Sequence, residues 1–178
     1  LPYPVLAKVS GVNGQLSSQL RELQRLDFLR ESRRRPDTEY VFKHALIRDV
    51  VYRTLLGRQR KQLHLRVGEA METLLGERLG EFHSIIAEHF LRAEAWARAA
   101  DYLLQAGDEA ARLAADADAR GHYEKAINAL ARLPDTVENR RRRIDTTIKQ
   151  AAVSWIADPP ELNLMRLAAA EGLAIELP

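Results

Sequence analysis

The sequence contains no cysteine, and this absence excludes disulfide bonds, thiolate metal sites and a cysteine nucleophile. It also has no apolar run near the roughly 20 residues that cross a lipid bilayer. Its first residues, Leu1-Pro2-Tyr3-Pro4, lack the charged-then-apolar pattern of a signal peptide. We therefore expect a cytoplasmic protein that does not enter a membrane.

Motifs for catalysis and nucleotide binding are missing as well. The sequence has no Gly-x-x-x-x-Gly-Lys-Ser/Thr phosphate loop, no His-Glu-x-x-His pair and no Gly-x-Ser-x-Gly elbow. Its histidines are scattered without the spacing of metal ligands, at His44, His64, His83, His89 and His122. We predict that the chain is not an enzyme and that it holds neither a metal nor a cofactor of its own.

The net charge of +2 is too small to indicate nucleic-acid binding by itself. Basic residues cluster at 33–35 and 140–143, and such runs are usually solvated. A chain of 178 residues, 46% of them apolar, is long enough for one good core or two small ones. Because it has no initiating methionine and begins abruptly with apolar residues, we expect a segment of a longer polypeptide.

The most informative stretch is residues 40–56, where the pattern of a strand changes to that of a helix. Tyr40 and Phe42 alternate with polar neighbours. Apolar residues then recur at helical spacing, at Leu46, Ile47, Val50, Val51 and Leu55. We predict a helix over 44–56 with Lys43 and His44 at its N-terminus, where free N–H groups and the helix dipole favour a bound anion.

The residues alone leave two interpretations of this helix open. In the first, His44 and Arg48 lie with Tyr52 along one helix face and approach a phosphate. In the second, the face is solvated, His44 contacts only a neighbouring loop, and Arg48 pairs with Asp49 or Glu39.

Two helices and a hairpin are predicted before this stretch. A short helix over 5–11 ends at Gly11, and Asn13 can cap a second helix. The second helix carries its leucines on one stripe, at Leu16, Leu20, Leu23 and Leu26. Residues 28–31 and 39–42 then flank a polar turn that contains Pro36-Asp37, which predicts a β-hairpin.

The rest of the chain is predicted to be almost entirely helical. Gly57 marks a break before a helix over 58–75, and alanine-rich helices follow from residue 82 onward. Short breaks are expected near Ala95, Gly107, Ala117-Asp118, Pro134-Asp135 and 158–160. Stacked helical hairpins are the architecture that this pattern favours.

One tetratricopeptide unit can be traced in these helices. Leu103-x-x-Ala106-Gly107-x-x-Ala110 fits its first helix, and Ala119-x-x-x-Tyr123-x-x-Ala126 fits its second. Small residues let the two helices approach closely, and the aromatic ring fills the remaining gap. We expect a degenerate preceding pair over 82–94 and 95–106, and a following pair over 138–157 and 160–175.

Four aromatic residues, Trp96, Tyr102, Tyr123 and Trp155, lie at helical spacing among alanines. We expect them to act as wedges between helices, since buried aromatics dominate repeat packing. Alternatively, Trp96, Tyr102 and Tyr123 line a groove that binds a partner.

The run Phe42-x-His44-Ala-Leu-Ile-Arg48-Asp-Val-x-Tyr52-x-x-Leu-Leu56, followed by Arg60-x-x-Leu-His64, resembles the end of the winged-helix domain in bacterial STAND-type signalling ATPases. The phrases Ala-Glu-His-Phe90 and Tyr102-Leu-Leu-Gln-Ala-Gly-Asp are similar to the helical repeats of the same group. In these proteins an AAA-like nucleotide switch precedes the repeats, often with a class III adenylate or guanylate cyclase or a LuxR-like DNA-binding domain.

This resemblance implies a mainly α fold in three parts. Residues 1–56 would be a truncated winged helix with a small β-hairpin, and residues 57–81 a connecting helix. Residues 82–178 would be an α-α superhelix of tetratricopeptide-like hairpins. The chain would be a noncatalytic regulatory segment whose repeats bind an unknown protein or small-molecule signal.

The resemblance also implies a role for His44 and Arg48, which would sense the phosphate of ADP bound to the ATPase core of the parent protein. ADP or ATP would then be a ligand of the parent and not of this chain. The alternative is a DNA-binding regulator that uses Arg33–Arg35 as a wing on phosphates. Its reading helix would expose Gln15, Ser18, Gln19, Glu22 and Arg25. We favour the first hypothesis and expect no nucleic-acid partner.

Overall fold

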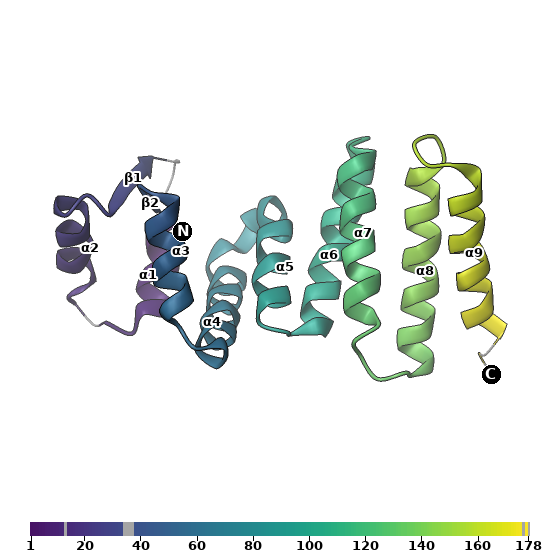
Figure 1. Cartoon of the computed structure of the whole chain (residues 1–178), viewed down its shortest axis with the longest axis horizontal. Helices are drawn as coiled ribbons and strands as arrows, with labels where there is room; N and C mark the ends of the chain where they lie inside the picture. The colour runs from purple at the N-terminus through teal and green to yellow at the C-terminus, as the bar shows by residue number, and fades with distance from the viewer. Residues whose placement is uncertain (13, 34–37, 176, 178) are drawn as a thin grey trace. The chain divides into compact units, whose positions relative to one another are not determined.

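The computed structural model describes residues 1–12, 14–33, 38–175 and 177. They form a mainly helical chain with one small antiparallel sheet, as Figure 1 shows. This confirms the predicted fold class at that level. Contacts divide the chain into two compact units, Leu1–Gly76 and Glu77–Pro178, which we call the first and the second unit. The assignment of 1–56, 57–81 and 82–178 to family domains remains a prediction.

The first unit combines helices with the predicted hairpin. Its elements are α1 (Tyr3–Ser10), α2 (Leu16–Arg25), β1 (Leu29–Arg33), β2 (Thr38–Phe42), α3 (Ala45–Thr54) and α4 (Gly57–Leu75). Gly11 ends α1 in the left-handed conformation with a φ of 67°, as expected for a residue without a Cβ atom. The suggested cap Asn13 and the Pro36-Asp37 turn lie outside the described residues.

The β-hairpin pairs β1 with β2 from Leu29 opposite Phe42 to Arg33 opposite Thr38. The other edge of β2 is also paired, because the Tyr40 N–H donates to the Leu1 carbonyl at 3.0 Å and the Leu1 amino group donates to the Tyr40 carbonyl at 3.1 Å. The start of the chain therefore adds a short extended segment to the sheet.

The apolar side chains of α3 are the least covered part of the first unit. None of the residues of α3 is buried, and Leu46, Val50 and Val51 are 75%, 55% and 47% exposed. By contrast, Val5 on α1 and Leu20 on α2 are buried. The apolar stripe predicted for 44–56 is present, but most of it is exposed, and only Ile47 and Leu55 are half-buried.

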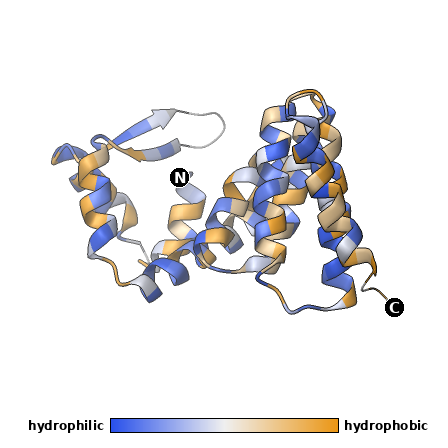
Figure 2. Cartoon of the chain, turned by 45° about the vertical axis from the view of Figure 1, so that its right-hand side comes forward, coloured by the Kyte–Doolittle hydropathy of each residue, from blue (hydrophilic) through white to orange (hydrophobic). Residues whose placement is uncertain are grey.

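The second unit is a stack of helical hairpins, whose helices α6 to α9 lie side by side in chain order (Figure 1). A 3₁₀ segment, η1 (Gly76–Phe82), leads into it. Its helices are α5 (His83–Arg92), α6 (Trp96–Arg112), α7 (Asp116–Leu130), α8 (Val137–Ser154) and α9 (Pro160–Ile175). Figure 2 shows that these helices carry hydrophobic and hydrophilic residues interleaved, as packed amphipathic helices do.

Three helices end with a residue other than glycine in the left-handed conformation. Asp27, Glu94 and Ala114 follow α2, α5 and α6 with φ values of 64°, 58° and 55°. In each case the next residue donates its N–H to a carbonyl five residues earlier, as Ala115 does to Ala110 at 2.9 Å. This is the six-to-one hydrogen bond of the Schellman motif. Composition does not reveal these helix ends.

The predicted breaks near Gly107 and Ala117-Asp118 are wrong, because the connection between α6 and α7 lies at residues 113–115. Helix α6 continues through Gly107 to Arg112, and residues 117–118 lie in the first turn of α7. The helix predicted over 95–106 is therefore the first part of α6 and not a separate helix. The preceding pair and the tetratricopeptide-like unit share this one helix.

All residues of the tetratricopeptide pattern are buried between helices. The two helices that carry them are α6 and α7, and the buried positions are Leu103, Ala106, Gly107, Ala110, Ala119, Tyr123 and Ala126. Gly107 faces the Tyr123 ring so closely that a Cβ atom built on it would lie 2.6 Å from Tyr123 Cε1. The physical expectation behind the pattern holds, since a small residue admits the ring.

Replacing Gly107 with alanine tests this contact. Alanine favours a helix interior by about 1 kcal/mol, but its methyl group has no space against a buried ring, and overpacking costs typically 1–3 kcal/mol. We expect Gly107→Ala to lower the free energy of unfolding in urea denaturation. Gly121→Ala on α7 is the matched control, because its Cβ would meet nothing within 4 Å; it should stabilise the protein. Equal gains from both substitutions would show that Gly107 is not packed as described.

Candidate functional site

His44 lies where the sequence places it, at the start of a helix. It precedes α3 as the N-cap with an extended backbone, φ −122° and ψ 123°, and its side chain makes no capping hydrogen bond. The imidazole is exposed. The geometry therefore leaves His44 accessible beside the N–H groups of the first turn of α3.

The two cations next to His44 are already paired. The Lys43 ammonium contacts both carboxylate oxygens of Asp27, at 2.5 and 2.6 Å. The Arg48 guanidinium forms an ion pair with Asp49 at 2.8 Å. The solvated interpretation of Arg48 describes this state. That Arg48 binds a phosphate stays a prediction, and it requires the Arg48 guanidinium to leave Asp49 and pair with the phosphate.

Tyr52 does not continue an exposed face with His44 and Arg48. Its hydroxyl lies 3.0 Å from Nε2 of His64 on α4, and the Arg60 guanidinium lies 5.2 Å from the centre of its ring. Tyr52 thus joins α3 to α4, and cation–π and hydrogen-bond contacts of this kind favour a packing role.

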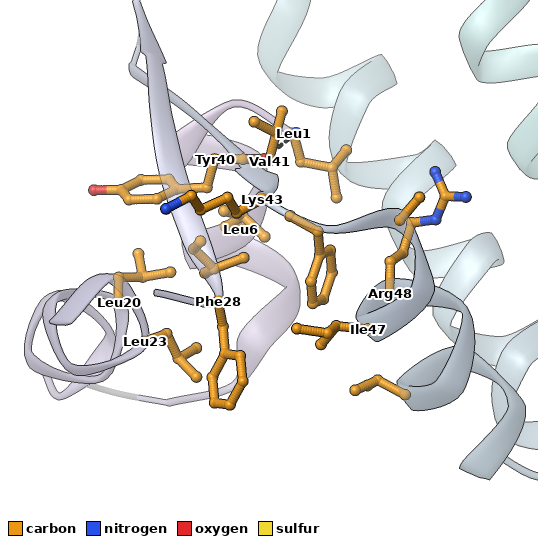
Figure 3. A pocket seen from close by; sticks show the side chains of 14 residues that line it. Leu1, Leu6, Leu20, Leu23, Phe28, Tyr40, Val41, Lys43, Ile47 and Arg48 are labelled. Atoms are coloured by element: carbon orange, nitrogen blue, oxygen red, sulfur yellow. Dashed lines mark hydrogen bonds between the residues drawn. The ribbon is translucent and has the colours of Figure 1, made fainter. Parts of the chain in front are cut away.

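An apolar pocket of about 850 Å³ opens inside the first unit (Figure 3). Helices α1, α2 and α3 and the hairpin all contribute to it. Its apolar lining includes Leu6, Leu20, Leu23, Phe28, Val41, Phe42, Ile47 and Val51. Lys43 and Arg48 also border it, and Figure 3 shows the Arg48 guanidinium directed away from the apolar side chains. Sequence reasoning did not find this pocket, although the leucine stripe of α2 supplies one of its walls.

The aromatic residues proposed for a partner groove take different positions. Tyr123 is buried, and its hydroxyl donates to Asp108 at 2.8 Å, so its proposed place in a groove is wrong and it acts as an inter-helix wedge. Burial and this hydrogen bond raise the pKa of Tyr123.

The other three aromatic residues are less deeply buried. Tyr102 stacks on Phe90 with ring centres 5.7 Å apart. Trp96 is half-buried with Arg132 above its ring, whereas Trp155 is 72% exposed and is not a wedge.

The exposed side chains of α2 mostly bond within this unit. Arg25 pairs with Glu22 at 2.7 Å, and the Ser18 hydroxyl donates to the Gln15 carbonyl at 2.7 Å. Gln19 is exposed. Of the predicted wing, Arg34 and Arg35 lie outside the described residues. No observation on this helix favours the DNA-binding alternative.

Helices α6 and α8 are joined by ion pairs at two levels. Asp101 pairs with Arg142, and Asp108 contacts Lys149 at 2.7 and 2.8 Å. A pocket of about 410 Å³ lies between the two levels. It is lined by Leu104, Arg142, Asp145, Thr146, Ile148 and Lys149. This pocket is the second unit's clearest candidate for a binding groove.

A further polar cluster, around Asp158, joins the last helices. Arg120 of α7 and Arg166 of α9 donate to the two Asp158 carboxylate oxygens at 2.5 and 2.6 Å. Only 12% of the Asp158 side chain is exposed. The Arg166 hydrogen bond, with the nearby Arg120 charge, holds the pKa of Asp158 below its ordinary value. Because arginines of two helices share this one carboxylate, the cluster is a structural clamp.

Two sequence-based exclusions can be compared with the described part of the chain. Within it, no three His, Asp or Glu side chains form a group that could hold a metal ion. Across the same residues, no helix has both the length and the apolarity that a bilayer crossing requires.

Comparison with known proteins gives little beyond this. No family model matches the sequence, and no solved structure matches it. The chain is 29% identical over 99 residues to an uncharacterized protein of Rhizobium meliloti (strain 1021). The match covers 56% of this chain and 10% of that protein. This similarity does not assign the chain to a family.

The exposure of α3 makes a direct prediction about stability. Leu46 is 75% exposed and Leu20 is 5% exposed, so the same truncation should have unequal effects. We expect Leu46→Ala to change the free energy of unfolding by less than about 0.5 kcal/mol. Leu20→Ala should lower it by roughly 2 kcal/mol or more. Urea denaturation of both variants measures the difference, and comparable losses would mean that α3 is covered in solution.

The Asp158 cluster predicts a dependence of stability on pH. A lowered carboxylate pKa stabilises the fold above the unfolded value of about 3.9, and this contribution is lost as pH falls through the folded pKa. Asp158→Asn should therefore destabilise the protein at neutral pH, and the deficit should shrink below about pH 4. Thermal unfolding across pH measures it, with the exposed Glu124→Gln as control. A deficit that is constant with pH would contradict the ion-pair explanation.

Proposed function

We propose that this chain is a noncatalytic regulatory and protein-interaction segment of a multidomain, cytoplasmic bacterial signalling protein of the STAND ATPase type. The parent protein would carry an output domain such as an adenylate or guanylate cyclase or a transcription activator. In this proposal the first unit contains the end of a winged helix, and the second unit is a tetratricopeptide-like array.

One observation carries the proposal. Helix α3 presents an uncovered apolar face together with an exposed histidine at its N-terminus. A soluble protein rarely leaves several large apolar side chains of one helix in water, and such faces mark interaction surfaces. A neighbouring module that docks on α3 would cover this face and meet His44 at the same time.

The proposed mechanism is a shift between two states of the parent. His44 and Arg48 would help to hold the closed state, in which the ATPase core contains ADP and docks on α3. Anions bind at helix N-termini because the free N–H groups and the dipole favour them, which suits a nucleotide phosphate. A protein or small-molecule signal that binds the helical hairpins would favour the open state through its different affinity for the two states.

The order of elements supports this assignment over an isolated helical repeat. Two helices, a hairpin and a further helix precede the stack, and the hairpin accepts the extended Leu1–Pro2 segment on its free edge. The described residues hold no cluster of metal-ligand side chains, and the lining of the apolar pocket lacks carboxylates and imidazoles. These features suit a docking surface better than a reaction site.

Replacing His44 in the parent protein tests the phosphate role. If His44 donates a charge-assisted hydrogen bond to ADP, His44→Ala should weaken ADP affinity roughly tenfold, since such bonds contribute about 1.5–3 kcal/mol. Isothermal titration of ADP into the full-length protein measures this. Arg53→Ala is the matched control, because it removes an exposed cation from the other end of α3. Unchanged ADP affinity in the His44 variant would remove the sensor role.

A further inference from the structure

Two ion pairs connect α6 to α8, and a pocket lies between them. The ion pairs are Asp101–Arg142 and Asp108–Lys149, and each joins residues 41 positions apart. A step of seven residues along α6 thus matches seven residues along α8, so the two helices run in the same direction. Two helical turns, roughly 10 Å, separate the ion pairs.

Between the two ion pairs, which we call the middle level, the pocket is lined by an aliphatic residue of α6 and a carboxylate of α8. Leu104 and Asp145 lie between the ion pairs and line the same pocket. Asp145 is exposed, and among the described residues it has neither an ion-pair nor a hydrogen-bond partner. Arg141, one turn earlier on α8, is equally without one. The lining of the pocket therefore contains one carboxylate without an ion-pair partner, beside the apolar side chains of Leu104 and Ile148.

The two cations that line the pocket do not offer an anion site. Arg142 and Lys149 are each bound to an aspartate of α6. Asp108 is held further by the hydroxyl of the buried Tyr123, so its ion pair with Lys149 is anchored to the core. A ligand with a carboxylate would have to displace one of these pairs and would face Asp145 as well. A ligand with a cation would complete the middle level.

We propose that the groove between α6 and α8 binds an extended peptide segment of a partner protein in which a lysine or arginine stands next to an aliphatic residue. The cationic group pairs with Asp145, and the aliphatic side chain packs on Leu104 and on Ile148, which is 50% exposed. This inference rests on the proposed partner-binding role of the helical hairpins and specifies the chemistry of the partner.

A methyl-labelled sample of the 178-residue chain allows a direct test by NMR titration. The probe is an acetylated and amidated peptide, Gly-Leu-Arg-Leu-Gly, and its twin carries citrulline, the neutral isostere, in place of arginine. We expect saturable shifts of the Leu104 and Ile148 methyl signals with the arginine peptide. The citrulline peptide should bind roughly fivefold more weakly, the size typical of an exposed ion pair.

Variants complete a double-mutant cycle. Asp145→Asn should lower the affinity for the arginine peptide to that for the citrulline peptide. It should leave the affinity for the citrulline peptide unchanged. Glu124→Gln, which removes an exposed and unpaired carboxylate from α7, should affect neither peptide. Because Asp145 is exposed, its variant should keep the methyl spectrum of the folded protein.

Three results would overturn the proposal: no shift at Leu104 and Ile148, equal affinity for the two peptides, or no effect of Asp145→Asn. Saturable binding confined to other residues of the second unit would also overturn this groove, yet it would leave the general partner-binding role standing. The ADP titration tests the role of His44 in the first unit, whereas the peptide titration tests the groove in the second unit. Either of these two tests can therefore fail without the other.

Discussion

The second unit depends on the close approach of α6 and α7 at Gly107. The absence of a side chain there admits the Tyr123 ring into the core, and the ring directs its hydroxyl to Asp108. Asp108 in turn accepts the Lys149 ammonium of α8. One small residue thus links the packing of two helices to the position of a third. This arrangement anchors one of the two ion pairs that join α6 to α8 beside the groove.

The two units differ in how completely they cover their apolar residues. In the second unit, the alanines of α6 and α7 and the rings of Phe90 and Tyr123 are buried. In the first unit, α3 buries none of its residues, and it lines a pocket of about 850 Å³ together with α1, α2 and the hairpin. Apolar surface left in water costs free energy in proportion to its area. That imbalance favours a docked neighbour on the first unit, and it is the physical basis of the proposed switch.

Much of the fold could be predicted from sequence because local patterns determine it. The β-hairpin, the stop of α1 at Gly11 and the helix after His44 follow from alternation, glycine and helical spacing, and the structure contains all three. The end of α6 could not be predicted in this way. Gly107 reads as a helix break when only its propensity is considered, but tertiary packing against Tyr123 retains it in a helix. The helix ends at Arg112, and the Schellman motif that follows places Ala114, not a glycine, in the left-handed conformation.

The candidate sites, like the fold, could be predicted only as far as local patterns determine them. Local patterns identified which residues could carry function, namely His44 at a helix start and the small and aromatic positions of α6 and α7, because spacing along a helix sets which residues share a face. Tertiary contacts set the state of these residues. The fold paired Lys43 with Asp27, buried Tyr123, exposed Trp155 and left Asp145 unpaired between two ion pairs. These outcomes depend on contacts between residues distant in the chain, and no local pattern encodes such contacts.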